Sequence, residues 1–424
     1  MFCINTKHTK RFILSYLSLC LLLFSIIFDP SNIHFGIKNL SFFLFCIINI
    51  RKISMKYILV PLYCISIFFM SYAHGLIIYS PIDSGIANWN ITSFLFLVTL
   101  LFVFNRELKF LYFFYYIALL FSIYIVFSEI FILFSFLTDT SIGTIIWDHI
   151  QNNSDFIMVG FRSVFGIPHP CLYYRSASIC IIPECVSLLL LIKTQQKKYL
   201  LHFILFFLEL FISGARANMI AAIMILFSCF FAYNFYKKKR IIFSYVLILL
   251  TISVAIFLLL SVVTEKEHSN LTKMGHMDSF YQLFNTNPIR FLFIGSGPGT
   301  IMYSLGTHRD MAITELSYFE LIKNYGFLPS FIMIQFFLLP VMYLYLSNVE
   351  NIIKFVFTIA YASFFFVAGT NPLFIGSTGF TIIICMFYVC DKNIYLEFNC
   401  ITIKHNKRDL LQRILRIING SRYD

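Results

Sequence analysis

The sequence predicts an all-α polytopic membrane protein with about twelve transmembrane helices. Its 424 residues are 59% hydrophobic and only 12% charged, whereas soluble domains carry about 25% charged residues. The apolar residues form about a dozen runs, most of them close to the ~20 residues that a helix needs to cross a bilayer. Strands of a membrane barrel would instead be segments of about 10 residues with alternating polarity, and the sequence lacks that pattern.

Each apolar run fits one membrane-spanning helix. The predicted spans are 12–28, 32–50, 57–79, 90–104, 110–137, 176–192, 199–212, 216–236, 241–263, 327–346, 353–369 and 374–391. The first run follows a basic stretch, as in a signal peptide, but no small-residue cleavage site follows it, so we predict an uncleaved span. Lys38 interrupts the second run, and a lysine that reaches toward the outer surface would explain this charge.

The distribution of charge predicts the orientation of the chain. The net charge of +12 is concentrated in clusters that alternate with loops poorer in Lys and Arg. Cytoplasmic loops of membrane proteins are enriched in these two residues. With the N-terminus inside, every basic cluster becomes cytoplasmic, and so does the basic tail, 392–424. We therefore expect both termini in the cytoplasm and no nucleic-acid partner.

Two predicted outer loops, 138–175 and 264–315, are much longer than the others. Long ordered loops usually carry function on a helical scaffold. Both contain basic residues on a face where the orientation rule does not require them: Arg162, His169 and Arg175 in the first, and Arg290, His308 and Arg309 in the second. These residues are either ligands for an anion or ordinary solvated charges.

The segment after the second loop is too long for one span. Gly326 and Pro329 interrupt it, so we predict a short outer helix from Glu315 to Tyr325, followed by a span that Pro340 kinks. The short helix has an apolar side and a polar side, the latter with Glu315, Glu320 and Lys323. Glu320 is expected to pair with Lys323 on the next turn. The short helix is predicted to rest at the membrane interface or to cover a lipid-linked substrate.

Arg216 is the most informative charge in the chain. It follows Ser213-Gly214-Ala215 and opens the eighth predicted span. An arginine costs about 2.5 kcal/mol or more inside a membrane helix, and a guanidinium at a helix N-terminus attracts anions. The pattern therefore predicts an anion site, with an ion pair to Glu209 as the alternative.

Two glutamates lie inside predicted spans. Glu184 follows Pro183 in the sixth span, and Glu129 lies in the fifth. A carboxylate at such a position should be paired, neutral or exposed to a polar cavity. Glu184 is expected to pair with Arg175 or Arg216, or to mark a proton pathway.

The segment Gly295-Ser296-Gly297-Pro298-Gly299 does not match a nucleotide-binding loop, because it lacks the Lys-Ser/Thr of that motif. We predict a conformationally permissive turn whose backbone could also surround a phosphate. The eleven cysteines are scattered and show no metal-ligand spacing. We therefore expect neither a metal nor a cofactor.

Three motifs in this order resemble the bacterial O-antigen polymerases and the related O-antigen ligases. They are Ser-Gly-x-Arg opening a mid-chain span, the Gly-rich run 293–299 in a long outer loop, and Glu315-Leu316-Ser317-Tyr318-Phe319-Glu320 followed by Tyr325-Gly326. In the ligases a histidine-asparagine pair precedes the last motif. Here Glu315-Leu316 takes that place, with His308 seven residues upstream. This departure favours the polymerases.

The resemblance implies an enzyme of the bacterial inner membrane with two periplasmic loops. Such an enzyme would join undecaprenyl-diphosphate-linked repeat units, with a chain-length regulator and a flippase as partners in the pathway. Arg216 would neutralise the departing diphosphate, and Glu315 would accept the proton of the attacking hydroxyl. The implied substrate-binding residues are Arg162, Arg175, Arg290, His308, Arg309 and Glu320.

Other functional classes remain open at this point. An O-antigen ligase or another glycosyltransferase that uses a lipid carrier would share the same architecture. A polysaccharide flippase or transporter should show internal repeats and broken helices. The sequence has no clear repeat, but Pro183-Glu184 is compatible with such a helix.

Overall fold

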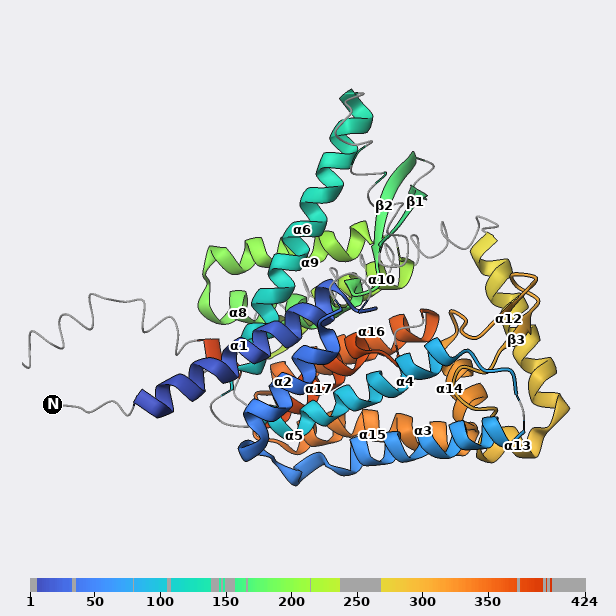
Figure 1. The fold of residues 1–424 in the computed structure, drawn as a ribbon. Helices are drawn as coiled ribbons and strands as arrows, with labels where there is room; N and C mark the ends of the chain where they lie inside the picture. The colour runs from blue at the N-terminus through green and yellow to red at the C-terminus, as the bar shows by residue number, and fades with distance from the viewer. Residues whose placement is uncertain are drawn as a thin grey trace, which may run out of the picture.

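The structure is a computed structural model, predominantly a bundle of long helices (Figure 1). It describes residues 6–32, 36–78, 80–104, 108–138, 145, 148, 157–164, 167–213, 215–236, 268–371, 374–391, 394, 397 and 398. In these residues, six helices are long and apolar enough to cross a membrane: Leu59–Ile77, Ser84–Val103, Phe110–Phe134, Ala177–Thr194, Phe327–Leu346 and Asn351–Gly369. The chain is therefore a multi-pass membrane protein.

The first part of the chain is entirely helical. Its elements are α1 (Thr6–Phe28), α2 (Lys38–Asn49), the short 3₁₀ turns η1 (Ile50–Lys52) and η2 (Met55–Tyr57), α3 (Leu59–Ile77), α4 (Ser84–Phe96), η3 (Leu97–Thr99), α5 (Leu100–Val103) and α6 (Phe110–Thr138). The 12 residues of α2 reach only about 18 Å. Lys38 is buried where α2 begins, with its ammonium group on the carbonyl oxygen of Pro30. The predicted reach toward the surface is therefore wrong, because a backbone acceptor holds this lysine inside.

The second part contains both helices and strands. Its elements are β1 (Ile157–Val164), β2 (Ile167–Tyr174), η4 (Ala177–Cys180), α8 (Ile181–Thr194), α9 (Lys197–Ile212), α10 (Arg216–Tyr236), α12 (His268–Thr286), α13 (Pro288–Phe293), β3 (Met302–Ser304), β4 (Arg309–Met311), α14 (Ser317–Tyr325), α15 (Phe327–Leu346), α16 (Asn351–Thr370) and α17 (Ser377–Asp391). Every predicted span except the ninth overlaps a helix in the described residues. The ninth span, 241–263, and most of the tail 392–424 lie outside the described residues.

Both long predicted loops contain a β-hairpin, which an all-α fold does not include. β1 and β2 pair antiparallel, with Arg162 opposite His169. β3 and β4 also pair antiparallel, with Ser304 opposite Arg309. Side chains from β2 anchor the first hairpin on the bundle, because Leu172 and Tyr174 are buried and Tyr174 packs edge-on against Phe121 of α6.

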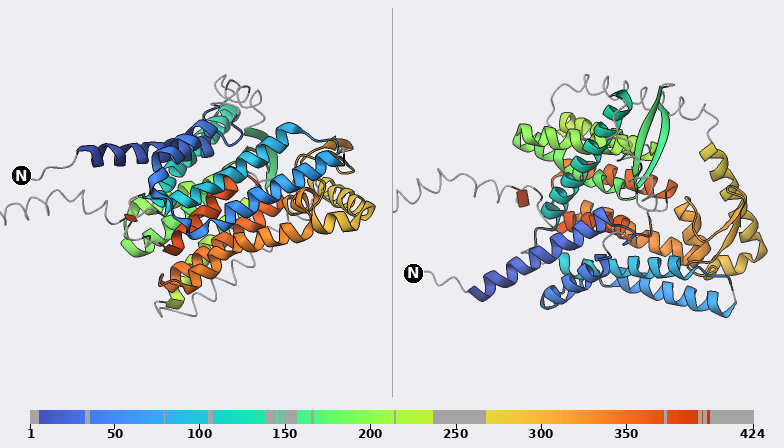
Figure 2. Two further views of the ribbon diagram at one scale, coloured as in Figure 1. Left: turned by 60° about the horizontal axis from the view of Figure 1, so that its bottom comes forward. Right: turned by 45° about the horizontal axis from the view of Figure 1, so that its top comes forward.

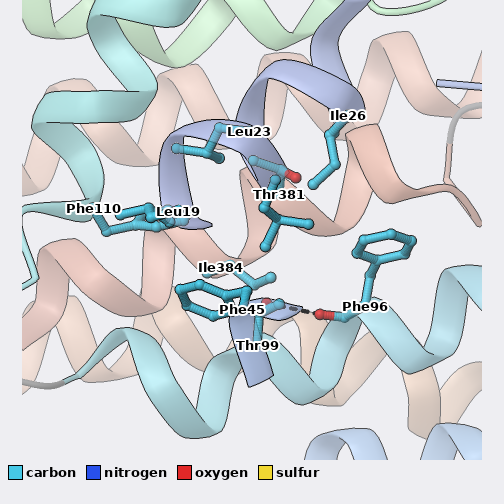
Figure 3. Close-up of a pocket in the computed structure, with 10 residues that line it drawn as sticks. Leu19, Leu23, Ile26, Phe45, Phe96, Thr99, Phe110, Thr381 and Ile384 are labelled. Carbon is cyan, nitrogen blue, oxygen red and sulfur yellow. Dashed lines mark hydrogen bonds between the residues drawn. The ribbon is translucent and has the colours of Figure 1, made fainter. Parts of the chain in front are cut away.

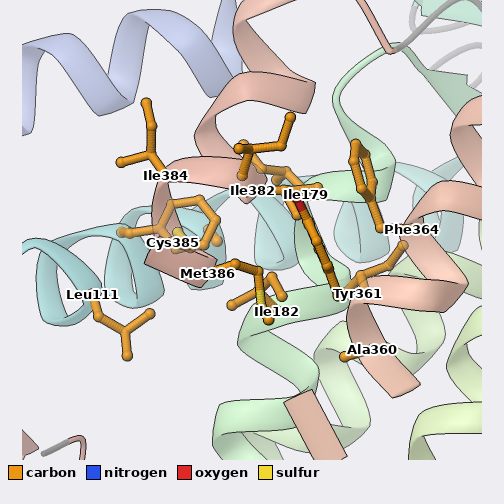
Figure 4. Packing of buried hydrophobic residues seen from close by; sticks show 14 of the residues in the cluster. Leu111, Ile179, Ile182, Ala360, Tyr361, Phe364, Ile382, Ile384, Cys385 and Met386 are labelled. Carbon is orange, nitrogen blue, oxygen red and sulfur yellow. The ribbon is translucent and has the colours of Figure 1, made fainter. Parts of the chain in front are cut away.

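The core lies where α6, η4, α8, α16 and α17 meet (Figure 4). Helix α17 is buried on every side from Ser377 to Cys390, as expected of a helix that is apolar all round. Tyr361 and Phe364 of α16 and Met386 of α17 are among the side chains that fill this region.

Residues 268–325 form a separate small lobe at one end of the bundle, beside the ends of α3 and α15 (Figures 1 and 2). Its own apolar core consists of Phe280, Met302 and Leu316, with Phe284 and Phe319 stacked around it. We call residues 268–325 the lobe.

Candidate functional site

The Gly-rich segment 295–299 attaches the lobe to the bundle. The amide of Ser296 donates to the carbonyl of Lys323 at 2.7 Å, and that of Gly297 donates to the carbonyl of Asn324 at 3.1 Å. The amide of Asp83, just before α4, donates to the carbonyl of Gly299 at 2.8 Å. The predicted permissive turn is confirmed. Protein carbonyls already occupy the amides of Ser296 and Gly297, so these groups do not form a phosphate nest.

Three glycines in this segment have left-handed backbones that require glycine. Gly295, Gly297 and Gly299 have φ values of 71°, 98° and 80°. A Cβ on Gly299 would lie 2.5 Å from the backbone oxygen of Asp83, and one on Gly295 would lie 2.6 Å from that of Lys323. Close backbone approach, rather than ligand binding, explains these glycines.

Lys323 holds the lobe together from the inside. Its side chain is completely buried, and its ammonium group donates to the carbonyls of Thr300 at 3.1 Å and Ala312 at 2.8 Å. It also pairs with Glu320 at 2.8 Å, which confirms the predicted contact. The second oxygen of Glu320 accepts the amide of Thr314 at 2.8 Å. Glu320 is therefore an interior group of the lobe, and the charges of α14 do not face water or lipid.

Glu315 is arranged differently. It precedes α14, so the prediction that Glu315 and Glu320 share one helix is wrong. The helix begins only at Ser317, because Leu316 has the non-helical angles φ −94° and ψ 80° and its carbonyl accepts the first intrahelical bond, from the amide of Glu320 at 3.0 Å. The carboxylate of Glu315 is half exposed and lies 3.6 Å from the ammonium group of Lys273 on α12.

Tyr173 links the first long predicted loop, through Asn371, to the start of α14. Its hydroxyl donates to Oδ1 of Asn371 at 3.4 Å, and the backbone oxygen of Asn371 accepts the hydroxyl of Ser317 at 2.6 Å. Burial raises the pKa of Tyr173 to about 12; Glu315 adds to this increase, and Arg175 opposes it. Glu315 and Arg175 both lie within electrostatic range of one phenol hydroxyl. These two predicted site residues thus share an electrostatic neighbour, while the ion-pair partner of Glu315 is Lys273.

His276 belongs to the same region but was missed by the sequence argument. It is buried on α12, with Nδ1 2.7 Å from the hydroxyl of Ser304. Burial lowers its pKa, while the charges of Glu315 and Glu320 partly offset that effect. Its position in the predicted loop 264–315 was the sequence feature that could have identified His276 as a site candidate.

The other predicted ligands of the second loop lie apart from Glu315. Arg290, on α13, donates to the hydroxyl of Ser296 at 3.0 Å and covers the ring of Phe291 at 4.7 Å, and burial lowers its pKa. His308 and Arg309 are exposed at the turn of the β3–β4 hairpin. In the described residues, none of these three side chains hydrogen-bonds or ion-pairs with Glu315.

Residues of the first loop are described only in part. Arg175 is exposed directly after β2. Arg162 and His169 are register partners in the hairpin. Because side chains alternate along a strand, the positions of His169 and Tyr173 share one face of β2. The side chains of Arg162 and His169 lie outside the described residues.

Arg216 opens α10 and is half buried. The chain places it at the β1–β2 end of the bundle, because α8 follows that hairpin and short turns join α8, α9 and α10. Asn371 follows α16, the main packing partner of α10. The carboxylate oxygens of Glu209 accept no hydrogen bond from nitrogen in the described residues, so the Arg216–Glu209 pair is not observed.

A pocket between α1, α2, α4, η3, α6 and α17 is lined by none of these polar residues (Figure 3). It is lined mainly by aliphatic and aromatic side chains. Its two threonines, Thr99 and Thr381, donate to backbone carbonyls within their own helices. The pocket therefore offers no polar group for catalysis.

No protein-family profile, curated protein or solved structure matches this chain. We therefore infer the function from the residues and their arrangement.

Proposed function

We propose that the protein is a bacterial O-antigen polymerase, a metal-independent glycosyltransferase that joins undecaprenyl-diphosphate-linked repeat units. The observation that supports this most is the cluster around Tyr173. There, a carboxylate from the second long loop and an arginine from the first lie within electrostatic range of one hydroxyl. Sugar transfer from a diphosphate carrier requires one anionic and one cationic group of this kind.

In the proposed reaction, a sugar hydroxyl of one repeat unit attacks the anomeric carbon of another. The bond between that carbon and the diphosphate oxygen breaks, and a glycosidic bond forms. Glu315 accepts the hydroxyl proton, while Arg175 and Arg216 neutralise the charge that develops on the diphosphate. Lys273 lies 3.6 Å from the carboxylate of Glu315 and holds it in place before the acceptor binds.

Glycan analysis of a deletion strain tests the reaction class. Loss of a polymerase leaves a single repeat unit on the acceptor, whereas loss of a ligase or flippase leaves none. Complementation with Arg216→Ala should restore membrane protein but no polymer. Arg216→Lys should rescue only part of the polymer, because an ammonium group lacks the planar guanidinium fork. Full-length polymer from the alanine variant would contradict the role of Arg216.

The proposal also includes twelve spans in the inner membrane, cytoplasmic termini and periplasmic loops. Reporter fusions test this arrangement. Fusions after Lys237 to Arg240 should report the cytoplasm, and fusions within 140–174 or 265–312 should report the periplasm. A cytoplasmic signal from either long loop would overturn the topology and remove the lipid-linked substrate from the site.

A further inference from the structure

Two carboxyl groups inside the bundle have no role in the proposed transfer. Glu184 lies in the first turn of α8 and Glu209 in the last turn of α9, and both are 0% exposed. Each lies within electrostatic range of the other. Their four oxygens accept no hydrogen bond from nitrogen or oxygen donors in the described residues. Buried polar groups without partners are rare and indicate a missing ligand or a functional site.

Two more buried oxygens without hydrogen-bond partners lie in the same region, namely Oδ1 of Asn218 and Oγ of Ser178. The amide nitrogen of Asn218 donates to the hydroxyl of Ser213 at 3.0 Å. Ser213 is four residues after Glu209, so it follows Glu209 on the same side of α9. Asn218 is thereby directed toward the Glu209 side of the helix junction.

Ser178 approaches from the opposite side of the junction. It lies in η4, which packs against α9. Two residues later, the thiol of Cys180 lies close to both carboxyl groups. The oxygens without partners therefore gather where η4 meets the ends of α8, α9 and α10.

In the part of the chain that the structure describes, no cation compensates the pair. The titratable groups that act on the pair are the thiols of Cys180, Cys185 and Cys229. In the described residues, no Lys, Arg or His charge acts on either carboxyl group; Arg216, at the start of α10, is the nearest arginine along the chain. Two uncompensated carboxylates in an apolar interior are strongly unfavourable. A proton or a cation must therefore bind to neutralise the charge.

We propose that Glu184 and Glu209 form a proton-binding site, a buried pair of carboxyl groups of which at least one retains its proton at neutral pH. A proton on either group removes one of two buried negative charges. In the described residues, no group of three or more His, Cys, Asp or Glu side chains could hold a metal ion. The proposal is independent of the glycosyltransferase function.

Labelling with dicyclohexylcarbodiimide tests this site in native membranes, because the reagent modifies protonated carboxyl groups in apolar surroundings. Peptide mass spectrometry should find the adduct on Glu184 or Glu209. Its yield should fall by up to about tenfold per pH unit once the proton dissociates. Glu350, an exposed carboxylate paired with Lys193, is the matched control and should remain unlabelled.

The Glu209→Gln variant sharpens the test. It removes the neighbouring negative charge, so labelling of Glu184 should persist but decline at lower pH than in the wild type. No adduct on either residue between pH 5 and 9 would overturn the proposal. Suppression of wild-type labelling by Na⁺ or Ca²⁺ at constant pH would overturn it too, because a metal cation would then occupy the pair.

Discussion

The lobe contains two lysine–glutamate pairs with opposite surroundings. Lys323 and Glu320 lie 2.8 Å apart with side-chain exposures of 0% and 7%. Both side chains also form hydrogen bonds with backbone groups. Lys273 and Glu315 lie 3.6 Å apart with exposures of 29% and 51%. A fully hydrogen-bonded interior pair fixes one structure, whereas an exposed pair contributes little stability and can exchange partners. The comparison separates a structural carboxylate from one that is available to substrate.

The largest expected effect is the loss of the interior pair. Lys323→Met leaves Glu320 buried and uncompensated, so we expect a destabilisation of about 3–5 kcal/mol and little protein in the membrane. Thermal unfolding of detergent-purified protein measures this. The matched variant Lys273→Met should change stability by less than about 1 kcal/mol. Equal effects of the two variants would remove the distinction between the pairs.

The second prediction concerns activity. Glu315→Gln preserves size but removes basicity, so most polymer should be lost at normal protein level. Glu320→Gln should instead lower the protein level, with the polymer reduced in proportion. Glycan ladders and immunoblots of the same strains measure both. Near-normal ladders from both variants would exclude Glu315 as the base.

The third prediction tests whether backbone contact secures the lobe. Gly299→Ala places a Cβ 2.5 Å from the oxygen of Asp83 at a φ of 80°, so we expect a cost above the roughly 1 kcal/mol of left-handed backbone alone. Gly36 has a φ of 63°, but a Cβ added there would meet nothing within 4 Å. Gly36→Ala therefore isolates the backbone cost, and similar unfolding temperatures for the two variants would contradict the clash.

The smallest effect should be a pH dependence of the lobe. Burial lowers the pKa of His276 below its usual value of about 6.5, so protonation favours the unfolded state. Stability should be complete above about pH 6.5 and decline as the pH falls below it. Unfolding temperatures across this range should show the decline. His276→Gln should reduce the slope, whereas His308→Gln, at an exposed turn, should leave it unchanged.

Local sequence patterns predicted the local features well. Apolar runs located the apolar helices but not α12 and α13, which lie in the predicted loop 264–315. The spacing of Gly326 and Pro329 predicted a short helix that the structure places at Ser317–Tyr325. The three-residue separation of Glu320 and Lys323 correctly predicted their contact. These features depend on neighbours within one or two helical turns, which the sequence contains directly.

Features that depend on distant segments were not predicted. Tyr173 and Glu315 lie within electrostatic range of each other although more than 100 residues separate them, and no periodicity encodes that approach. The two hairpins were missed because counts of apolar runs detect spans rather than short strands. The start of α14 after Glu315 depends on the non-helical backbone of Leu316, which residue composition alone does not reveal.

The bonds of Gly299 also set an order of assembly. Two backbone hydrogen bonds complete the corner between α3 and α4: the amide of Asp83 donates to the carbonyl of Gly299, and the amide of Ile301 donates to the carbonyl of Pro81. More than 200 residues separate the two partners of each bond. At about 5–20 residues per second, a ribosome needs roughly 10 to 40 seconds after Asp83 to synthesise the partner residues Gly299 and Ile301. The first helices must therefore wait in the membrane with an unfinished corner, and a chain truncated before residue 299 should be a preferred substrate for quality-control proteases.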